Sequence, residues 1–302
     1  MKTILKKLRF LSGNILGYLI YKLSGKNALL KNINKHKVLS IYFHNPSVYV
    51  FNTVISWLLD HNYTLISLEE LKDSFEQGGC SNERSVFISF DDAWSNNLKL
   101  IPIIEKFNLP ITLFVSTKAI EDGAIWLNIV RKQFTSIDQK LKEGISISDL
   151  KKIPHDFGLK LYYSAKKAGI IEREIMTKQE LIKFSEFASI GSHTVTHPIL
   201  TNCSLKTIKF EIDQSFETLN EWQLGICESF AYPNGSFNKK IIDILKQSKY
   251  KYAFTTEPRF IDLLAKENNY TIPRICIPDG FGKYENLARM SSVWSKFFNR
   301  WR

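Results

Sequence analysis

The alternation of short, β-rich apolar runs with helical patterns constrains the fold of this chain more than any other feature. Seven runs of four to six residues recur along the 302 residues. Parallel strands need a crossover connection, which is usually a helix, so the pattern predicts an α/β fold of βα units around a mostly parallel sheet or barrel. The runs are VLSIYF at 38–43, YTLISL at 63–68, VFISF at 86–90, ITLFVS at 111–116, SFAY at 229–232, YAFTT at 252–256 and IPRICI at 272–277.

Helix starts are marked by two capping-box patterns, in which Ser67 precedes Glu70 and Thr177 precedes Glu180 by three residues. About 70 residues before position 190 lack a clear strand, and their apolar positions 125, 126, 129, 130 and 134 follow helical spacing. We therefore expect a helical insertion over about 118–185. It either packs on the body or covers a site as a lid.

Positive charge is concentrated at the two ends of the chain. Residues 1–38 hold nine Lys or Arg and no Asp or Glu, and residues 283–302 hold five Lys or Arg and one Glu. Subtracting this +9 and +4 from the net charge of +11 leaves −2 for residues 39–282. We expect three segments: a basic, partly apolar N-terminal segment at 1–37, a nearly neutral α/β body at 38–282 and a basic, aromatic tail at 283–302.

The mixture of apolar and basic residues in both end segments suits peripheral contact with an anionic membrane surface, the alternative being a basic helix packed on the body. The N-terminal apolar stretch is too interrupted for a spanning helix of about 20 residues and lacks an A-x-A-like cleavage site. The four cysteines show no CxxC spacing, which favours a reducing compartment. We expect a cytoplasmic protein at the inner membrane face and no nucleic-acid partner, since no nucleic-acid motif accompanies the charge.

Two adjacent carboxylates, Asp91 and Asp92, follow the third apolar run in the stretch SFDD. Two such groups repel each other at the edge of a core, so something must compensate their charge. A turn or helix cap is one explanation, because Asp is common at both. A bound cation is the other.

The stretch GSHTVTHP places His193 and His197 four residues apart. Neutral imidazoles at this spacing can bind one Zn²⁺. The HExxH helix of zinc peptidases is excluded because Thr194 stands where its glutamate would be, and Pro198 favours a loop for His197. One carboxylate and two imidazoles would form a three-ligand, water-accessible site, and the second carboxylate could accept a proton from water.

SFDD, SHTVTHP and FAYPNGSFN, in this order, resemble the first three motifs of the polysaccharide deacetylases, the NodB-type carbohydrate esterases (family 4). The resemblance covers roughly residues 38–280 and implies a distorted (β/α)7-type barrel that removes acetyl groups from N-acetylated sugars. It implies one divalent metal ion, with zinc expected and Co, Ni, Mn or Fe left open. By position, Asp91 matches the family's general base, and the matching metal ligands are Asp92, His193 and His197.

The same resemblance assigns two further groups. The backbone N–H of Asn234, after Pro233, matches the family's oxyanion donor. His44, at the end of the first run, matches the general acid in a branch of the family with a displaced motif. A structural histidine is the alternative, although the chain has no histidine after His197.

The chain departs from the family pattern at three places. Ala93 and Trp94 replace the usual glycine, and Asn234 stands where an aromatic residue is common. Ala231 stands where many members place an arginine that steadies the base. Arg274 could supply that cation to Asp91, the alternative being an arginine at the surface or bound to a carbonyl. Four side chains are expected to contact the substrate, with core packing the alternative for the two tryptophans: Trp94, Trp126, Tyr232 and Arg274.

We therefore expect a metal-dependent N-deacetylase acting on an N-acetylhexosamine in a bacterial surface or lipid-linked glycan. Two alternatives stay open. One is a non-catalytic glycan-binding or assembly protein on the same fold, which the missing arginine and altered turn would favour. The other is an amide or imide hydrolase acting on a small molecule.

Overall fold

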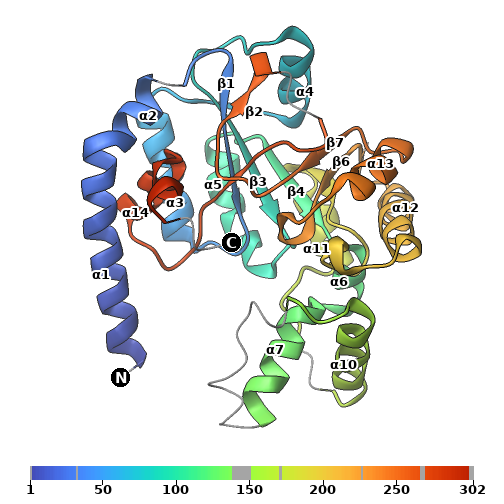
Figure 1. The fold of residues 1–302 in the computed structure, drawn as a ribbon. Coiled ribbons are helices and arrows are strands. Elements are labelled where there is room, and N and C mark those ends of the chain that lie inside the picture. Colours follow the sequence, from blue (N-terminus) through green and yellow to red (C-terminus); the bar gives the residue numbers. More distant parts are fainter. Residues whose placement is uncertain are drawn as a thin grey trace.

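Nine strands form one curled sheet in the computed structural model, which describes residues 2–31, 33–137, 151–169, 172–225, 227–265 and 269–298 (Figure 1). The strand order is β7-β6-β5-β4-β3-β1-β8, with β2 beside β3 and β9 beside β1. Every pairing is parallel except that of β1 with β8. The strands are β1 (Lys37–Phe43), β2 (Thr64–Ile66), β3 (Ser85–Asp91), β4 (Ile111–Val115), β5 (Ala188–Ser192), β6 (Ser229–Ala231), β7 (Tyr252–Phe254), β8 (Ile261–Asp262) and β9 (Ile275–Cys276).

All seven predicted runs contain a strand, and the predicted distorted (β/α) barrel is confirmed. The strands β5 and β8 were not among the predicted runs. The sequence of β5, ASIGS, has one large apolar residue and no alternation, and β8 has only two residues. Their strand conformation comes from pairing with β4 and β1, which a local pattern does not reveal.

Helices surround the sheet (Figure 1). Both predicted capping boxes are formed, at Ser67 with Glu70 and at Thr177 with Glu180. The helices before the insertion are α1 (Lys2–Ile20), η1 (Tyr21–Gly25), α2 (Lys26–Lys31), α3 (Val48–Asp60), α4 (Leu68–Gln77), η2 (Ser95–Leu100) and α5 (Ile101–Lys106). Those after it are η3 (Leu200–Asn202), α12 (Leu205–Glu221), η4 (Pro233–Gly235), α13 (Lys239–Gln247), η5 (Leu263–Ala265), α14 (Lys283–Met290) and α15 (Val293–Phe297).

A helical insertion separates β4 from β5, as predicted. Its described parts are α6 (Thr117–Asp122), α7 (Trp126–Ile137), α10 (His155–Lys167) and α11 (Lys178–Phe184). In Figure 1, α7 and α10 lie side by side at the end of the molecule where β4 ends. They meet closely at Gly158, where a Cβ atom would lie 2.3 Å from the Trp126 ring.

Alternation along β3 separates the two parts of the core. Val86, Ile88 and Phe90 belong to the cluster shared with the surrounding helices, whereas Phe87 belongs to the smaller cluster inside the curl of the sheet. Because side chains alternate along a strand, Ser89 and Asp91 share the inner face with Phe87. The strand therefore delivers Asp91 to the interior at its carboxyl end.

Helices near the two ends of the chain lie on one side of the body, where α1 packs against α14 and α14 against α3 (Figure 1). None of the described helices is both long enough and apolar enough to cross a membrane. The division of the chain at 37/38 and 282/283 remains a prediction.

Candidate active site

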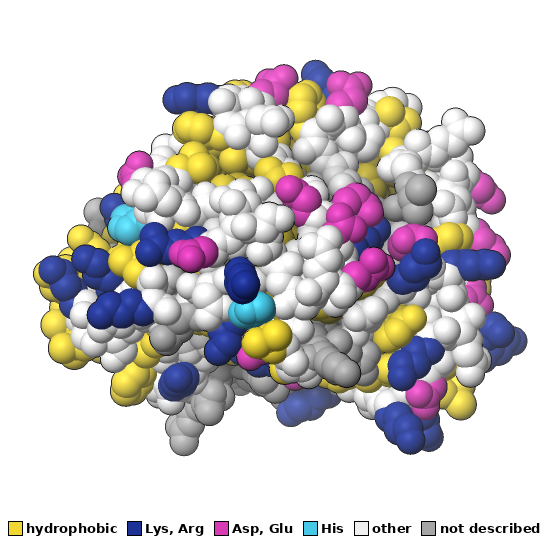
Figure 2. Space-filling model, turned by 90° about the horizontal axis from the view of Figure 1, so that it is seen from above, with side chains coloured by type: hydrophobic (Ala, Val, Ile, Leu, Met, Phe, Trp, Pro, Cys, Tyr) yellow, Lys and Arg dark blue, Asp and Glu magenta, His cyan; other side chains and the backbone are white. Residues whose placement is uncertain are grey.

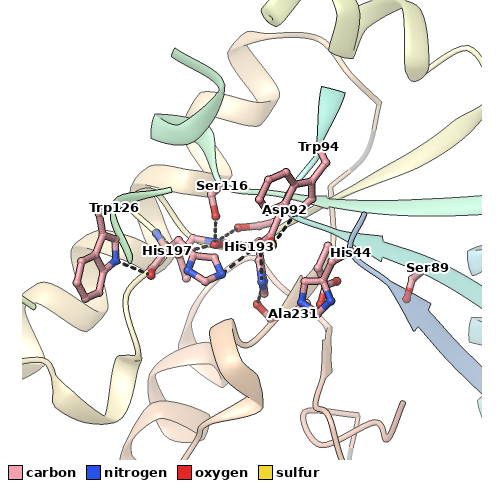
Figure 3. A network of polar contacts seen from close by, with 12 residues as sticks. His44, Ser89, Asp92, Trp94, Ser116, Trp126, His193, His197 and Ala231 are labelled. Atoms are coloured by element: carbon pink, nitrogen blue, oxygen red, sulfur yellow. Dashed lines mark hydrogen bonds and ion pairs between the residues drawn. The ribbon is translucent and has the colours of Figure 1, made fainter. Parts of the chain in front are cut away.

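Asp92, His193 and His197 come together where β3 and β5 end (Figure 3). Their candidate ligand atoms all lie within 4.8 Å of one another. The carboxyl ends of parallel strands share one edge of a sheet, so residues 100 positions apart in sequence can meet there. The structure thus brings together the three residues predicted as metal ligands.

The imidazoles are oriented toward Asp92. His193 Nδ1 lies 2.7 Å from the carbonyl oxygen of Ala231, so that this N–H donates and Nε2 is left facing Asp92. Asp92 Oδ1 lies 3.2 Å from His197 Nε2 and 3.7 Å from His193 Nε2. Burial lowers the pKa of His193 to about 4, which keeps its ring neutral and able to bind a metal at pH 7.

Asp92 Oδ1 is buried and has no hydrogen-bond partner among the described residues. A buried carboxylate oxygen in that state needs a compensating charge or donor. Two ligands bound tetrahedrally to one Zn²⁺ at about 2.0 Å lie about 3.3 Å apart, close to the Asp92–His197 and Asp92–His193 separations. The residues therefore fit a divalent metal ion.

Trp94 orients the other oxygen of Asp92, because its indole N–H donates to Oδ2 at 3.1 Å. Asp92 and Ala93 both have positive φ, at 76° and 56°. This conformation suits glycine, which explains why the family pattern has glycine here. Burial alone would raise the pKa of Asp92, but the His197 imidazole that faces Oδ1 at 3.2 Å outweighs burial and holds that pKa below its ordinary value.

Glu211 of α12 holds the loop between the two histidines. Its buried carboxylate accepts from the backbone N–H groups of Val195 and Thr196, each at 2.9 Å, and from the Thr196 hydroxyl at 2.5 Å. Such a loop needs support because His197 has a φ of 57°, which is costly for a residue with a side chain. Glu211 therefore compensates backbone strain at a predicted ligand.

Trp126 connects the helical insertion to the same loop. Its indole N–H donates to the carbonyl oxygen of His197 at 3.0 Å (Figure 3). Its ring packs edge-on against His155 of α10. His155 in turn hydrogen bonds to Thr196 at 2.8 Å. Trp126 is only 4% exposed. This burial argues against the predicted role in stacking on a sugar and favours the packing alternative.

Asp91 lies beside the cluster and forms a two-point ion pair with Arg274. Arg274 donates to its two oxygens at 2.7 and 2.9 Å, and also to the Ser89 hydroxyl at 3.0 Å. Burial would raise the pKa of Asp91, but the charge of Arg274, then that of His193, brings it below its ordinary value. The carboxylate is thus ionised at neutral pH, as a general base must be.

Arg274 is fully buried, with its guanidinium stacked on the ring of Tyr42 at 4.4 Å. It therefore supplies the cation that the sequence lacks at Ala231. This position is inconsistent with the predicted direct contact with substrate, because no part of the side chain reaches the surface.

His44 follows β1 and is exposed at the edge of the site (Figure 3). Desolvation opposes protonation, but the neighbouring Cys276 side chain and the charges of Asp92 and Asp91 outweigh it and raise the pKa of His44 to about 9. The imidazole is therefore protonated at pH 7 and can donate a proton. Cys276 is placed there by the register of β9, in which it pairs with Tyr42.

The turn after β6 contains Asn234 at a φ of 59°. Its side-chain oxygen accepts a hydrogen bond from Lys151, the first residue of the described stretch 151–169 of the insertion. Tyr232 precedes this turn, is fully buried and donates to the carbonyl oxygen of Tyr270 at 2.9 Å. That burial argues against the predicted contact of Tyr232 with substrate.

Sequence patterns did not single out Glu211, Ser116 or Cys276. Ser116 follows β4 and donates to the His193 carbonyl oxygen at 2.6 Å. Each of these residues acts through a contact with a distant segment, so no local spacing identifies it. Only the position of Ser116 at a strand end offered a signal.

Comparison with known proteins agrees with this geometry. A family model described as polysaccharide deacetylase matches residues 78–253. The poly-β-1,6-N-acetyl-D-glucosamine N-deacetylase of Staphylococcus aureus (strain MSSA476) is 25% identical over 306 residues, which cover 92% of this chain and 87% of the relative. The putative polysaccharide deacetylase YxkH of Bacillus subtilis (strain 168) is 20% identical over 244 residues, which cover 78% and 68%.

Two solved structures share the fold. The Streptococcus pyogenes deacetylase PplD, in complex with acetate, superposes with a TM-score of 0.60 at 18% identity and covers 80% of this chain and 93% of its own. IcaB from Ammonifex degensii superposes with a TM-score of 0.59 at 14% identity and covers 86% and 98%. At this level of identity the likeness supports the fold.

Proposed function

This chain belongs to the polysaccharide deacetylase family, and from that premise we propose that it is a metal-dependent hydrolase that removes N-acetyl groups from an N-acetylhexosamine glycan. The observation that carries the proposal is the buried, unpartnered Asp92 Oδ1 facing two imidazoles, with the ion-paired Asp91 beside it. A binding protein would not need a carboxylate kept ionised next to such a cluster.

Asp92, His193 and His197 would hold the ion. A divalent ion there supplies Lewis-acid chemistry, since it polarises the acetyl carbonyl and lowers the pKa of water toward 7. Zinc is the expected metal, and Co, Ni, Mn and Fe accept the same donors.

Asp91 would take the proton from the attacking water. Its pKa below the ordinary value keeps it ionised, and Arg274 fixes both of its oxygens in place. The backbone N–H of Asn234 would donate to the oxyanion of the tetrahedral intermediate. His44, protonated at pH 7, would give a proton to the departing amine.

The substrate is proposed from the relatives. The Staphylococcus aureus proteins are named for poly-β-1,6-N-acetyl-D-glucosamine, so oligomers of that polymer are the first to test. Other bacterial surface and lipid-linked glycans with N-acetylhexosamines form the rest of the panel. Trp94 is partly exposed beside Asp92 and would contact the sugar.

The test is release of acetate from this panel by the purified full chain. Activity should disappear with EDTA and return when a divalent metal is added back. His193→Gln should remove it, whereas His36→Gln should not. The latter is a matched change at a histidine whose imidazole bonds only to the Gly78 carbonyl among the described residues. The proposal fails if the metal-loaded chain releases no acetate from any N-acetylated glycan.

A further inference from the structure

The N-terminal helix α1 is fixed to the body by one face only. A Cβ atom at Gly17 would lie 2.5 Å from backbone atoms of Glu285, so α1 approaches the α14 backbone at a distance that only glycine allows. Asn14, one turn earlier, accepts a hydrogen bond from the Tyr284 backbone N–H at 3.0 Å. These contacts set which side of α1 faces outward.

The outward side carries an exposed apolar stripe. Eight of the seventeen large hydrophobic side chains that the structure shows as exposed lie between residues 8 and 23. Five of them follow at intervals of three or four residues, which places them on one helix face. This outer stripe, which begins on α1 and ends in η1, consists of Leu8 (57% exposed), Leu11 (57%), Ile15 (55%) and Leu19 (50%) of α1 and Leu23 (77%) of η1.

Cations flank the outer stripe. Lys22 and Lys26 are exposed, and Lys22 Nζ lies 5.6 Å above the Tyr18 ring. Residues 1–38 hold no acidic residue to neutralise them. Figure 2 shows hydrophobic and basic side chains next to one another at its left edge, the side that α1 and α2 occupy in Figure 1.

Of a second copy of the chain, a nucleic acid and an anionic lipid surface, only the lipid surface satisfies both properties of this face. A second copy of the chain would bring two segments of charge +9 together, and they would repel. A nucleic acid would neutralise the cations but leave the leucines in water. An anionic lipid surface accepts apolar side chains at the level of its headgroups and attracts cations beside them.

We propose that the outer stripe of α1, with Lys22 and Lys26, is the surface by which this protein docks on an anionic phospholipid membrane. The helix lies in the plane of the interface, and its buried face remains on α14. The N-terminal end of α1 lies toward the same end of the molecule as α7 and α10 (Figure 1). The proposal is independent of the deacetylase activity.

Vesicle co-sedimentation of the full chain tests it. The protein should sediment with vesicles of phosphatidylcholine and phosphatidylglycerol and much less with phosphatidylcholine alone. Ile15→Glu/Leu19→Glu should lower the bound fraction at least about tenfold, because it places charge on the apolar face. Raising the salt from about 0.1 to about 1 M should also release protein, since the screening length falls from about 10 to about 3 Å.

Leu205→Glu/Leu264→Glu is the matched control, because these side chains are equally exposed, at 56% and 64%, on other elements. It should bind vesicles as the wild type does. Unchanged circular dichroism and acetate release from a short soluble oligosaccharide would show that both variants are folded. The proposal is overturned if the wild type and the Ile15→Glu/Leu19→Glu variant sediment equally with vesicles. It is also overturned if light scattering shows a dimer for the wild type and a monomer for that variant.

Discussion

Replacing Arg274 by methionine should destabilise the fold by about 3–5 kcal/mol at pH 7, the usual cost of removing one partner from a buried ion pair. Both groups are almost inaccessible, at 0% for the Arg274 side chain and 2% for that of Asp91, and they share hydrogen bonds of 2.7 and 2.9 Å. Methionine fills much of the space beside Tyr42, so the cavity contributes little. Most of the loss therefore comes from the unpaired carboxylate.

Urea unfolding followed by circular dichroism measures this change in unfolding free energy. The double variant Asp91→Asn/Arg274→Met should lose less than Arg274→Met alone, because it leaves no buried charge without a partner. A loss below about 1 kcal/mol for the single variant, or equal losses for both, would refute the reasoning.

The pH dependence has a definite sign. In the wild type the pKa of Asp91 is below its ordinary value, so the stabilisation is present above the ordinary pKa and is lost as the pH falls through the folded value. Without Arg274, burial raises that pKa, and protonation at lower pH relieves the cost. The stability difference between wild type and variant should therefore shrink from pH 7 to pH 4, and a constant difference would contradict the account.

Three further changes separate the roles of other residues. Trp126→Phe should weaken metal binding by roughly 10-fold or more, because it removes a group that orients a ligand. Competition with a chelator measures the affinity, and Trp57→Phe in α3 is the control that should leave it unchanged. His44→Gln should lower kcat by roughly 10²–10⁴ without loss of metal, and should abolish the fall in wild-type activity expected above pH 9, where His44 loses its proton. Ser67→Ala should cost about 1 kcal/mol in thermal or urea unfolding, by loss of the cap of α4, and leave acetate release unchanged.

Residue types at strand ends made the centre of the site predictable. Asp91 and Asp92 follow a run of strand-forming residues, and His193 and His197 have metal-ligand spacing, so both were recognisable before any contact was known. Arg274 was also named as a possible cation for Asp91, although the complete burial of the Arg274 side chain was not predicted.

Contacts between distant segments account for what the sequence did not reveal. The support of Glu211 for the 193–197 loop depends on how α12 packs against β5. Trp126 was predicted to stack on a sugar, with core packing as the alternative. The structure favours packing, because α10 encloses the ring and the indole N–H donates to the His197 carbonyl. Ala93 departs from the family pattern, and the structure shows its positive φ as the reason that glycine is usual there.

The central claim is that two adjacent aspartates have different tasks, and a pair of isosteric variants tests it most directly. Metal content by mass spectrometry and acetate release are measured on the same preparations of Asp91→Asn and Asp92→Asn. We predict that Asp91→Asn retains one metal ion per chain and releases no acetate, and that Asp92→Asn loses the metal. Acetate release by Asp91→Asn, or equal loss of metal from both variants, would contradict the division of labour.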